Sequence, residues 1–359
     1  MSEDYSPERL RQEVRALEAA LATVAANPQT GSFASSPDRL DGELEERLAE
    51  AQRALKYHNA FLDDYLRAIL PADLILLGAP TGLGKTDLAL NIATTNAFLG
   101  KRVHYFALEA EPRELERRTK FALLSKAVYA AHHDERHKMN YADWRLGKCE
   151  AICGQWNSVV SAQFESNLRP LWTLYRGNKF DAKDLEKQVI EVHEKTDLMV
   201  IDHLHYIDTS SDDNEARALG DVVKTIRDIA LNVGKPVILI AHLRKKETGS
   251  KRLVPGLDDF HGSSNITKIC TQAITIERCH VVQSSSWFLS PTFFSVLKDR
   301  RSGASPFVAV SNFDRRTKSY ASTYTLGKLT KGGSDWEPLP FNDKPEWASG
   351  HRALDQKAA

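Results

Sequence analysis

The chain has 359 residues, 42% of them hydrophobic, which is enough to bury one large core or two smaller ones. Its 48 basic and 48 acidic residues give a formal net charge of zero. No overall basic field therefore attracts nucleic acid, and any such contact must come from a local patch. The four cysteines include no C-x-x-C pair, which argues against zinc and suits a reducing compartment such as the cytoplasm. No apolar run approaches the length of a membrane span and no signal peptide is visible, so we expect no membrane contact.

Residues 1–55 predict a helical arm. Their apolar residues step by four and three positions, the spacing of a heptad repeat. These residues are Leu10, Val14, Leu17, Leu21 and Val24, followed after a loop by Leu44, Leu48, Ala51 and Leu55. The pattern indicates a helical hairpin or a short coiled coil that faces a partner subunit or the body of the protein. An ordinary pair of helices packed on its own core explains the spacing equally well.

Residues 56–335 alternate between predicted strands and helices. Strands are expected at 74–77, 102–109, 197–202, 236–241, 273–277, 293–298 and 306–313. Helices are expected at 87–95, at 217–233 and over 112–192, the last one broken near Asn140 and by a short strand at 171–178. This alternation predicts an α/β fold with a mostly parallel, doubly wound sheet flanked by helices. Residues 336–359 are polar and aperiodic, and they predict a tail.

The segment after the first strand has the composition of a phosphate-binding loop. It comprises Ala79, Pro80, Thr81, Gly82, Leu83, Gly84, Lys85 and Thr86. Its two glycines permit a tight turn whose N–H groups converge, and the helix that follows adds its positive end. Lys85 is placed to contact the β and γ phosphates, and the Thr86 hydroxyl is placed to ligate Mg²⁺. In the pattern G-x-x-x-x-G-K-[ST], Ala79 replaces the first glycine. We expect this loop to bind a nucleoside triphosphate such as ATP together with Mg²⁺.

Two acidic residues follow hydrophobic strands at the edge where parallel sheets bind ligands. Asp202 ends the run Leu198-Met199-Val200-Ile201 and is expected to assist the Mg²⁺ ion opposite Thr86. Glu109 ends the run that begins at Arg102 and is placed to orient or deprotonate an attacking water molecule. Glu109 could instead be a solvated acid that starts a helix from Glu109 to Glu116, and a structural role is the weaker alternative for Asp202.

His242 ends another aliphatic strand, where it could hydrogen-bond to the γ phosphate and report its loss to the next segment. A lone histidine is as often a structural residue.

The segment that follows His242 is a basic loop, residues 243–255, with five cations: Arg244, Lys245, Lys246, Lys251 and Arg252. Such a loop suits phosphate contacts along a nucleic-acid strand, although a charged loop is more often merely solvated. No aromatic residue lies among the cations, so we expect backbone contacts rather than base stacking.

Lys298 and Arg300 lie on a predicted turn far from the phosphate-binding loop in sequence. A guanidinium there could serve a neighbouring subunit as an arginine finger. Taken alone, such a turn is more often ordinary surface.

Together these blocks resemble the RecA-like motor domain of DnaB-family replicative helicases, in the variant found in phage primase-helicases and Twinkle-type helicases. The likeness runs from about Phe61 to Tyr320. Its blocks are the alanine-containing loop, Tyr105–Glu109, Val200–Leu204, Ile240–Leu243 and Asp258–Ile266. In the last block, His261 and Ser264 stand where the family commonly has Arg and Gly. Nothing in the first 55 residues reads as a zinc-binding primase module or as the usual N-terminal domain of these helicases.

The resemblance implies that Glu109 is the catalytic glutamate, Asp202 the metal-assisting acid and His242 the γ-phosphate sensor. It also implies that Lys298 and Arg300 act in trans on the ATP of a neighbouring subunit, and that Phe313 packs beside the adenine. The implied activity is that of an ATP-driven helicase or translocase in DNA replication. The implied assembly is a ring, expected to be a hexamer, around single-stranded DNA. A primase, a loader or a polymerase would be its partners, in a bacterial, phage or plasmid system.

Two other classes remain open from the sequence. One is a RecA-like recombinase filament, and the other is a regulatory ATPase of the same fold, in which slow hydrolysis controls assembly with protein partners. Stimulation of the ATPase by DNA would argue against the regulatory class. Directional unwinding of a forked duplex would argue against the recombinase.

Overall fold

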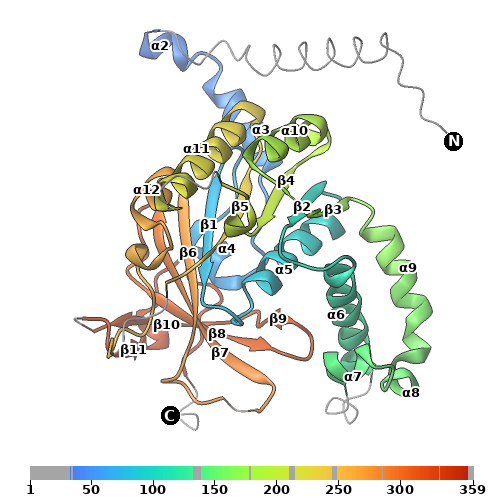
Figure 1. The fold of residues 1–359 in the computed structure, drawn as a ribbon. Coiled ribbons are helices and arrows are strands. Elements are labelled where there is room, and N and C mark those ends of the chain that lie inside the picture. Colours follow the sequence, from blue (N-terminus) through green and yellow to red (C-terminus); the bar gives the residue numbers. More distant parts are fainter. Residues whose placement is uncertain are drawn as a thin grey trace, which may run out of the picture.

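The structure, a computed structural model, describes residues 33, 35–131, 139–177, 179–209, 215–244, 249–284, 286–330 and 332–354. One sheet organises them, with the strand order β11-β10-β8-β7-β6-β1-β5-β4-β2-β3, and β9 pairs with β8 (Figure 1). The strands are β1 Leu74–Ala79, β2 Val103–Ala107, β3 Leu171–Tyr175, β4 Leu198–Asp202, β5 Val237–His242, β6 Gln272–Arg278, β7 Leu289–Asp299, β8 Val308–Asp314, β9 Ser319–Tyr320, β10 Thr325–Leu329 and β11 Trp336–Pro338. The six strands from β6 to β3 pair in parallel, and β7, β8, β10 and β11 continue the sheet antiparallel.

Helices cover both faces of the parallel strands. After the N-terminal arm, the helices other than the short α7 and α8 are α4 Ala60–Leu66, α5 Lys85–Phe98, α6 Glu114–Ala131, α9 Asn157–Asn167, α10 Ala182–Val192, α11 Glu215–Val233 and α12 Ser263–Ile269. Successive side chains of a strand point to opposite faces, so β1 is apolar on both. Ile75 and Leu77 belong to the core under α4 and α5, whereas Leu74 and Leu76 belong to the core under α10, α11 and α12. The predicted α/β architecture with a mostly parallel sheet is confirmed.

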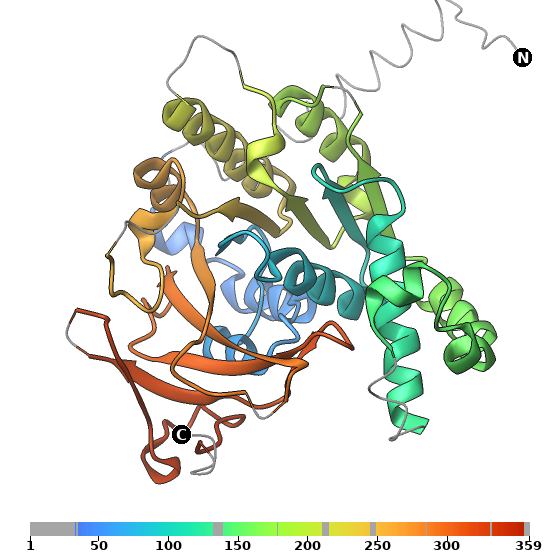
Figure 2. The same cartoon turned by 60° about the horizontal axis from the view of Figure 1, so that its bottom comes forward.

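A smaller helical lobe extends from the edge of the sheet beside β3. It contains α6, α7 Tyr141–Arg145, α8 Glu150–Cys153 and α9, and it has its own apolar core around Phe121 and Cys153. The sequence placed a break near Asn140, and the Asn140 side chain indeed caps α7 by accepting the N–H of Asp143. Figure 2 shows this lobe on the opposite side of the parallel strands from the antiparallel strands.

The prediction of a polar tail from Trp336 is wrong for residues 336–354. Strand β11 pairs with β10, and the Trp336 indole donates a hydrogen bond to the carbonyl of Val308 and packs edge-on against Phe293. Further along, Ala348 and His351 are fully buried, and His351 Nδ1 accepts the N–H of Leu326. A few well-placed buried groups dock this segment, and no periodic pattern reveals them.

Only the end of the predicted N-terminal arm lies among the described residues. The stretch from Leu10 to Val24 lies outside them. Helices α2 Ser36–Arg39 and α3 Glu43–Arg53 carry no buried residue, and Leu44 and Leu48 are each 54% exposed. Among the described residues, no helix is both long and apolar enough to cross a bilayer.

Substituting Trp336 tests whether the C-terminal segment stabilises the domain. Trp336→Ala removes a side chain that is 5% exposed, so we expect the free energy of unfolding to fall by about 3–5 kcal/mol. Trp287→Ala is the matched control because Trp287 is 63% exposed, and it should change stability by about 0.5 kcal/mol or less. Denaturant titration of both variants measures the difference. Equal effects would show that residues 336–354 do not stabilise the fold.

Candidate nucleotide-binding and hydrolysis site

The loop between β1 and α5 has the geometry of an anion-binding turn. Gly82 and Gly84 adopt φ of +81° and +82°, a region that other residues rarely enter. Helix α5 begins at Lys85, and no side chain caps its first turn. Its first N–H groups are therefore available to a ligand at the positive end of the helix.

A cavity of about 550 Å³ opens beside this loop, a volume typical of small-molecule sites. The predicted residues that line it are Thr81, Gly82, Gly84, Lys85, Thr86, Glu109 and Asp202. Ala79, Pro80 and Leu83 complete the loop without lining the cavity, and Ala79 is the buried last residue of β1. Arg118 and Lys318 also line it, and both pair with Asp87 of α5, at 3.4 and 3.9 Å. No sequence pattern joins these distant cations to the loop, and sequence reasoning missed them.

Asp202 ends β4 and is 4% exposed. Its Oδ2 accepts a hydrogen bond from the Tyr105 hydroxyl at 2.8 Å, whereas its Oδ1 is buried and accepts none from the residues that the structure describes. Burial raises the pKa of this carboxyl, and hydrogen bonds from Tyr105 and Thr86 partly oppose that shift. A buried carboxylate oxygen without a partner, next to a threonine hydroxyl, fits the oxygen ligands that Mg²⁺ prefers.

Lys85 and Glu109 face this acid from two sides. Lys85 is 6% exposed, and its Nζ donates to Nδ1 of His242 at 2.8 Å. Burial lowers the pKa of Lys85, and the charges of Glu109 and Asp202 oppose that shift. Glu109 follows β2, and its side chain is 44% exposed at the cavity. The structure thus brings together five of the predicted residues: Lys85, Thr86, Glu109, Asp202 and His242.

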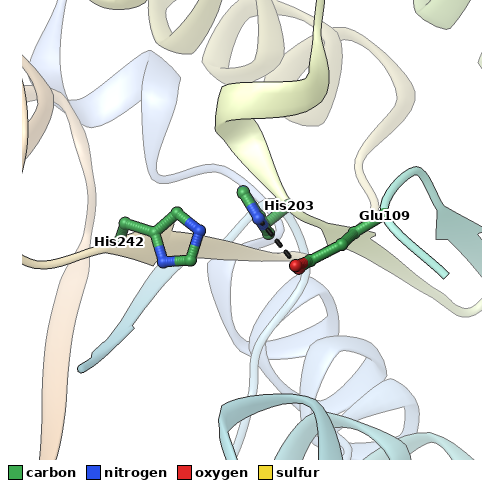
Figure 3. A group of neighbouring side chains, drawn as sticks. All are labelled: Glu109, His203 and His242. Atoms are coloured by element: carbon green, nitrogen blue, oxygen red, sulfur yellow. Dashed lines mark ion pairs between the residues drawn. The ribbon is translucent and has the colours of Figure 1, made fainter. Parts of the chain in front are cut away.

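Three further histidines surround His242. The His203 ring lies 4.1 Å from that of His242, and His205 lies within 5.3 Å of His242 and 5.2 Å of His261, measured between ring centroids. His203 Nε2 is 2.9 Å from Oε2 of Glu109 (Figure 3). Burial, with smaller effects of His242 and Lys85, lowers the pKa of His203 to about 2. Two histidines at alternate positions just after Asp202 were the available signal, but their sequence spacing does not show that the rings meet His242.

Lys298 and Arg300 lie at the opposite edge of the sheet. Asp299 of β7 pairs with Gln272, the first residue of β6. The phosphate-binding loop instead follows the last residue of β1, which runs parallel to β6. The two sites therefore lie at opposite ends of the strands. Lys298 donates to the carbonyls of Thr267 and Lys268, and Arg300 donates to those of Lys268 and Ile269. Both cations therefore cap the last turn of α12 and take no part in the chain's own cavity.

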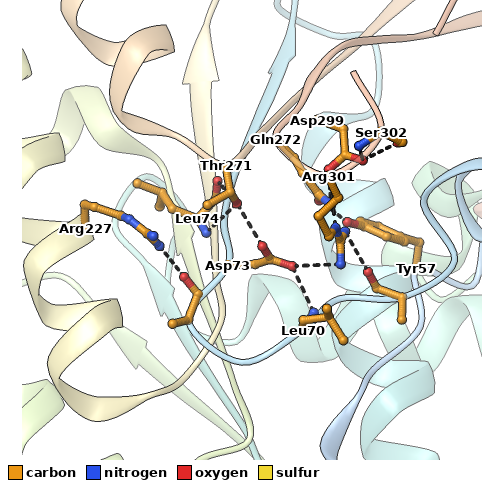
Figure 4. Close-up of polar contacts among 12 residues, drawn as sticks. Tyr57, Leu70, Asp73, Leu74, Arg227, Thr271, Gln272, Asp299, Arg301 and Ser302 are labelled. Carbon is orange, nitrogen blue, oxygen red and sulfur yellow. Dashed lines mark hydrogen bonds and ion pairs between the residues drawn. The ribbon is translucent and has the colours of Figure 1, made fainter. Parts of the chain in front are cut away.

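A polar network holds the turn that carries these two cations (Figure 4). Asp299 is 5% exposed, accepts the N–H of Ser302 at 3.0 Å and receives a hydrogen bond from Gln272. Arg301 bridges Asp299 and Asp73, at 3.4 and 3.7 Å. The backbone position of Arg300 is thus set by residues on both sides of it.

Phe313 is 9% exposed and packs against Tyr320, with 5.0 Å between the ring centroids. It does not line the cavity. Lys318, which does, has its Nζ 5.9 Å from the Phe313 ring centroid. The predicted adenine contact through Phe313 therefore stays a prediction.

The basic loop leaves β5 directly after His242. Its stem is closed by a bridge between Leu243 and Phe260, and Gly78 of β1 lies so close beneath that a Cβ there would meet the Phe260 ring at 2.5 Å. Arg244, Lys251 and Arg252 are exposed, with Arg252 paired to Asp259 at 3.3 Å. Lys245 and Lys246 lie outside the described residues.

The buried histidines predict a pH-dependent stability. His203 stays neutral in the folded chain, whereas an unfolded histidine takes up a proton below pH about 6.5. The unfolded state then binds more protons, so the free energy of unfolding falls as pH falls, by about 2 kcal/mol from this residue between pH 6.5 and 5. Denaturant titrations at both pH values should give a smaller fall for His203→Asn than for wild type. An equal fall would show that His203 is protonated in the folded chain.

The comparisons with known proteins agree with this geometry. The model of the family "DnaB-like helicase C terminal domain" matches residues 55–321. A probable plasmid replicative DNA helicase of Chlamydia trachomatis is 20% identical over 265 residues, which is 73% of this chain and 53% of the relative. The corresponding protein of Chlamydia muridarum is 24% identical over 253 residues, 70% of this chain and 51% of the relative. The chain spans about half the length of these curated relatives.

Solved structures show the same fold. One solved ATPase domain superposes with a TM-score of 0.65 at 14% identity, covering 80% of this chain and 99% of that one. A DnaB-like replicative helicase, solved in a study of its interactions with primase, gives a TM-score of 0.60 at 14% identity, covering 87% and 76%. Because the family model matches well over half of the sequence, this chain belongs to the family of DnaB-like helicase C-terminal domains.

Proposed function

We propose that this chain is the ATP-hydrolysing motor of a replicative DNA helicase, which forms a hexameric ring and moves along single-stranded DNA. The observation that carries the proposal is the convergence of Lys85, Thr86, Glu109 and Asp202 on one cavity. These are the groups that phosphoryl transfer to water requires: a phosphate cradle, ligands for Mg²⁺ and an acid to handle the water.

Each group has a distinct role in the proposed reaction. The turn at Gly82 and Gly84 and the start of α5 hold the phosphates, with Lys85 neutralising their charge. Thr86 and Asp202 would hold Mg²⁺, which when bound neutralises charge on the β and γ phosphates. Glu109, at the mouth of the cavity, orients the water and accepts its proton.

His242 would couple this chemistry to DNA. Its Nδ1 accepts a hydrogen bond from Lys85, the residue that contacts phosphate when nucleotide binds. A change at Lys85 therefore reaches the end of β5, and the basic loop begins at the next residue. We assign DNA-backbone contacts to this loop, through Arg244, Lys245, Lys246, Lys251 and Arg252.

Lys298 and Arg300 would complete the site of the next subunit. They lie at the sheet edge remote from their own cavity, so they can act on ATP only across a subunit interface. Hydrolysis then requires the ring.

We further propose that residues 1–55 form an arm for assembly or for partner binding and that residues 56–335 form the motor. A primase, a loader or a polymerase would be its partners in a cytoplasmic replication system.

Removing the lysine of the loop should abolish turnover. Lys85→Ala deletes the charge that faces the phosphates, and we expect ATP hydrolysis to fall by about 10²–10³-fold or more. Lys187→Ala removes an exposed lysine of α10 and should match wild type. Phosphate release with purified chains measures both. Undiminished hydrolysis by Lys85→Ala would refute the assignment of this loop.

Removing the guanidinium at the remote edge should affect turnover but not binding. Arg300→Ala should bind a fluorescent ATP analogue as wild type does, yet lose about 10³-fold of its DNA-stimulated hydrolysis. Arg169→Ala is the control, because Arg169 is 76% exposed in a surface ion pair. Mixing Arg300→Ala with Lys85→Ala chains should restore partial activity, since each variant supplies what its neighbour lacks. No recovery in stable mixed rings would contradict action in trans.

Single-stranded DNA should stimulate hydrolysis, and a forked duplex should be unwound in one direction. Both follow from a DNA-contacting loop attached to the phosphate sensor. Steady-state ATPase assays with and without DNA, alongside a strand-displacement assay, test this. Slow hydrolysis indifferent to DNA would indicate a regulatory ATPase, and stimulation with strand exchange but no unwinding would indicate a recombinase.

A further inference from the structure

Three strand ends bring a carboxylate and two imidazoles to one point. Glu109 follows β2, His203 follows β4 and His242 ends β5, and one ligand atom of each lies within 4.8 Å of the other two (Figure 3). We propose that Glu109, His203 and His242 bind a divalent transition-metal ion such as Zn²⁺, at a site distinct from the Mg²⁺ ligands Thr86 and Asp202. The sequence argued against zinc because it lacks a cysteine pair, but this site needs no cysteine.

The ligand types select the class of ion. Two histidine nitrogens and one carboxylate oxygen are a common set for Zn²⁺, with a fourth position open to water. Mg²⁺ and Ca²⁺ prefer oxygen ligands throughout, so the nitrogens discriminate against the ion that accompanies ATP. The residue types alone therefore separate this site from that of the nucleotide's metal.

His203 and Glu109 lie close together in the way that two ligands of one metal ion do. His203 is fully buried, and its Nε2 lies 2.9 Å from Oε2 of Glu109, yet the two atoms are not aligned as a hydrogen bond. A buried polar nitrogen without a hydrogen bond destabilises the folded chain. Two ligands of one tetrahedral Zn²⁺ ion lie roughly 3.3 Å apart, so a small adjustment would let an ion satisfy both atoms.

The second layer of the site is also rich in histidine. Both ring nitrogens of His205 are buried without a hydrogen-bond partner, and its ring centroid lies 5.3 Å from that of His242. The backbone N–H of His205 donates to Nδ1 of His203 over 3.3 Å, a long contact. Coordination through Nε2 of His203 moves the ring proton to Nδ1, and this long hydrogen bond is then lost.

Metal binding would also release Lys85. The ammonium of Lys85 donates to Nδ1 of His242 at 2.8 Å. Coordination by His242 ends this contact whichever ring nitrogen binds the ion. If Nδ1 binds it, the ion takes the place of Lys85. If Nε2 binds it, the ring proton moves to Nδ1, which can then no longer accept a hydrogen bond from Lys85. If the proposed function holds, an ion that occupies Glu109 and His242 blocks water activation and phosphate sensing together. The site is then an inhibitory metal switch.

Metal uptake by the full-length chain tests the site without reference to catalysis. The probe is Co²⁺, whose visible absorption reports nitrogen and oxygen coordination, with Zn²⁺ as its competitor. After treatment with chelator, wild type should bind about one Co²⁺ per chain and release it to Zn²⁺. Glu109→Gln and His203→Asn should each weaken binding by about 10–100-fold or more. His280→Ala, which removes an exposed histidine outside the cluster, should bind as wild type does.

Two outcomes would overturn the site: no uptake by wild type, or equal uptake by wild type and Glu109→Gln. Circular dichroism checks the fold of His203→Asn. If that variant fails to fold, Glu109→Gln decides, because its side chain is 44% exposed and the substitution preserves its shape.

Hydrolysis of ATP at constant Mg²⁺, with Zn²⁺ added and then chelated, tests the inhibition separately. Reversible loss of activity that follows metal occupancy is the expected result. A chain that binds Co²⁺ as described but hydrolyses no ATP would refute the proposed function and leave the metal site standing.

Discussion

The parallel register of four neighbouring strands is the constraint on which the site depends. β1 pairs with β5, β5 with β4 and β4 with β2, all in the same direction. Neighbouring strands lie about 4.8 Å apart, so any polar residue that ends one of them lies beside the end of the next. Ala79 pairs with His242, and Ala107 pairs with Asp202. The backbone hydrogen bonds of the sheet, rather than contacts among the polar side chains, therefore hold Lys85, Glu109, Asp202 and His242 together.

The same sheet separates the two halves of the proposed catalytic machinery. The residues proposed to hold phosphate and metal and to activate water lie at the carboxyl ends of the parallel strands. Strand β7 runs antiparallel to β6 and leaves Arg300 at the other edge. This arrangement makes the proposed catalysis depend on assembly, because the strands hold Arg300 at the opposite end from the chain's own cavity. The network around Asp299 and Arg301 fixes the backbone of this turn, while the guanidinium of Arg300 donates to the carbonyls at the end of α12.

Sequence reasoning succeeded where a single run of residues determines the structure. Buried parallel strands are short aliphatic runs, so β1, β4 and β5 were predictable, as was the glycine-lysine loop between β1 and α5. It failed where the determinant is a meeting of distant residues. Trp336 and His351 dock through contacts with Val308 and Leu326, which no local pattern encodes. The approach of His203 to Glu109 and His242 likewise depends on which strands are neighbours in the sheet, and the order of strands cannot be read from spacing along the chain.

The basic loop is fixed to the fold at both of its ends. Leu243 pairs with Phe260, and both rest on Gly78, where no side chain intervenes. The chain between them is fixed a second time, because Val254 is buried beside Phe293 and Trp336, and the N–H of Leu253 donates to the carbonyl of Gly333. The charge that this loop presents can therefore change, for example at the exposed Lys251, without moving His242 or the strand that carries it.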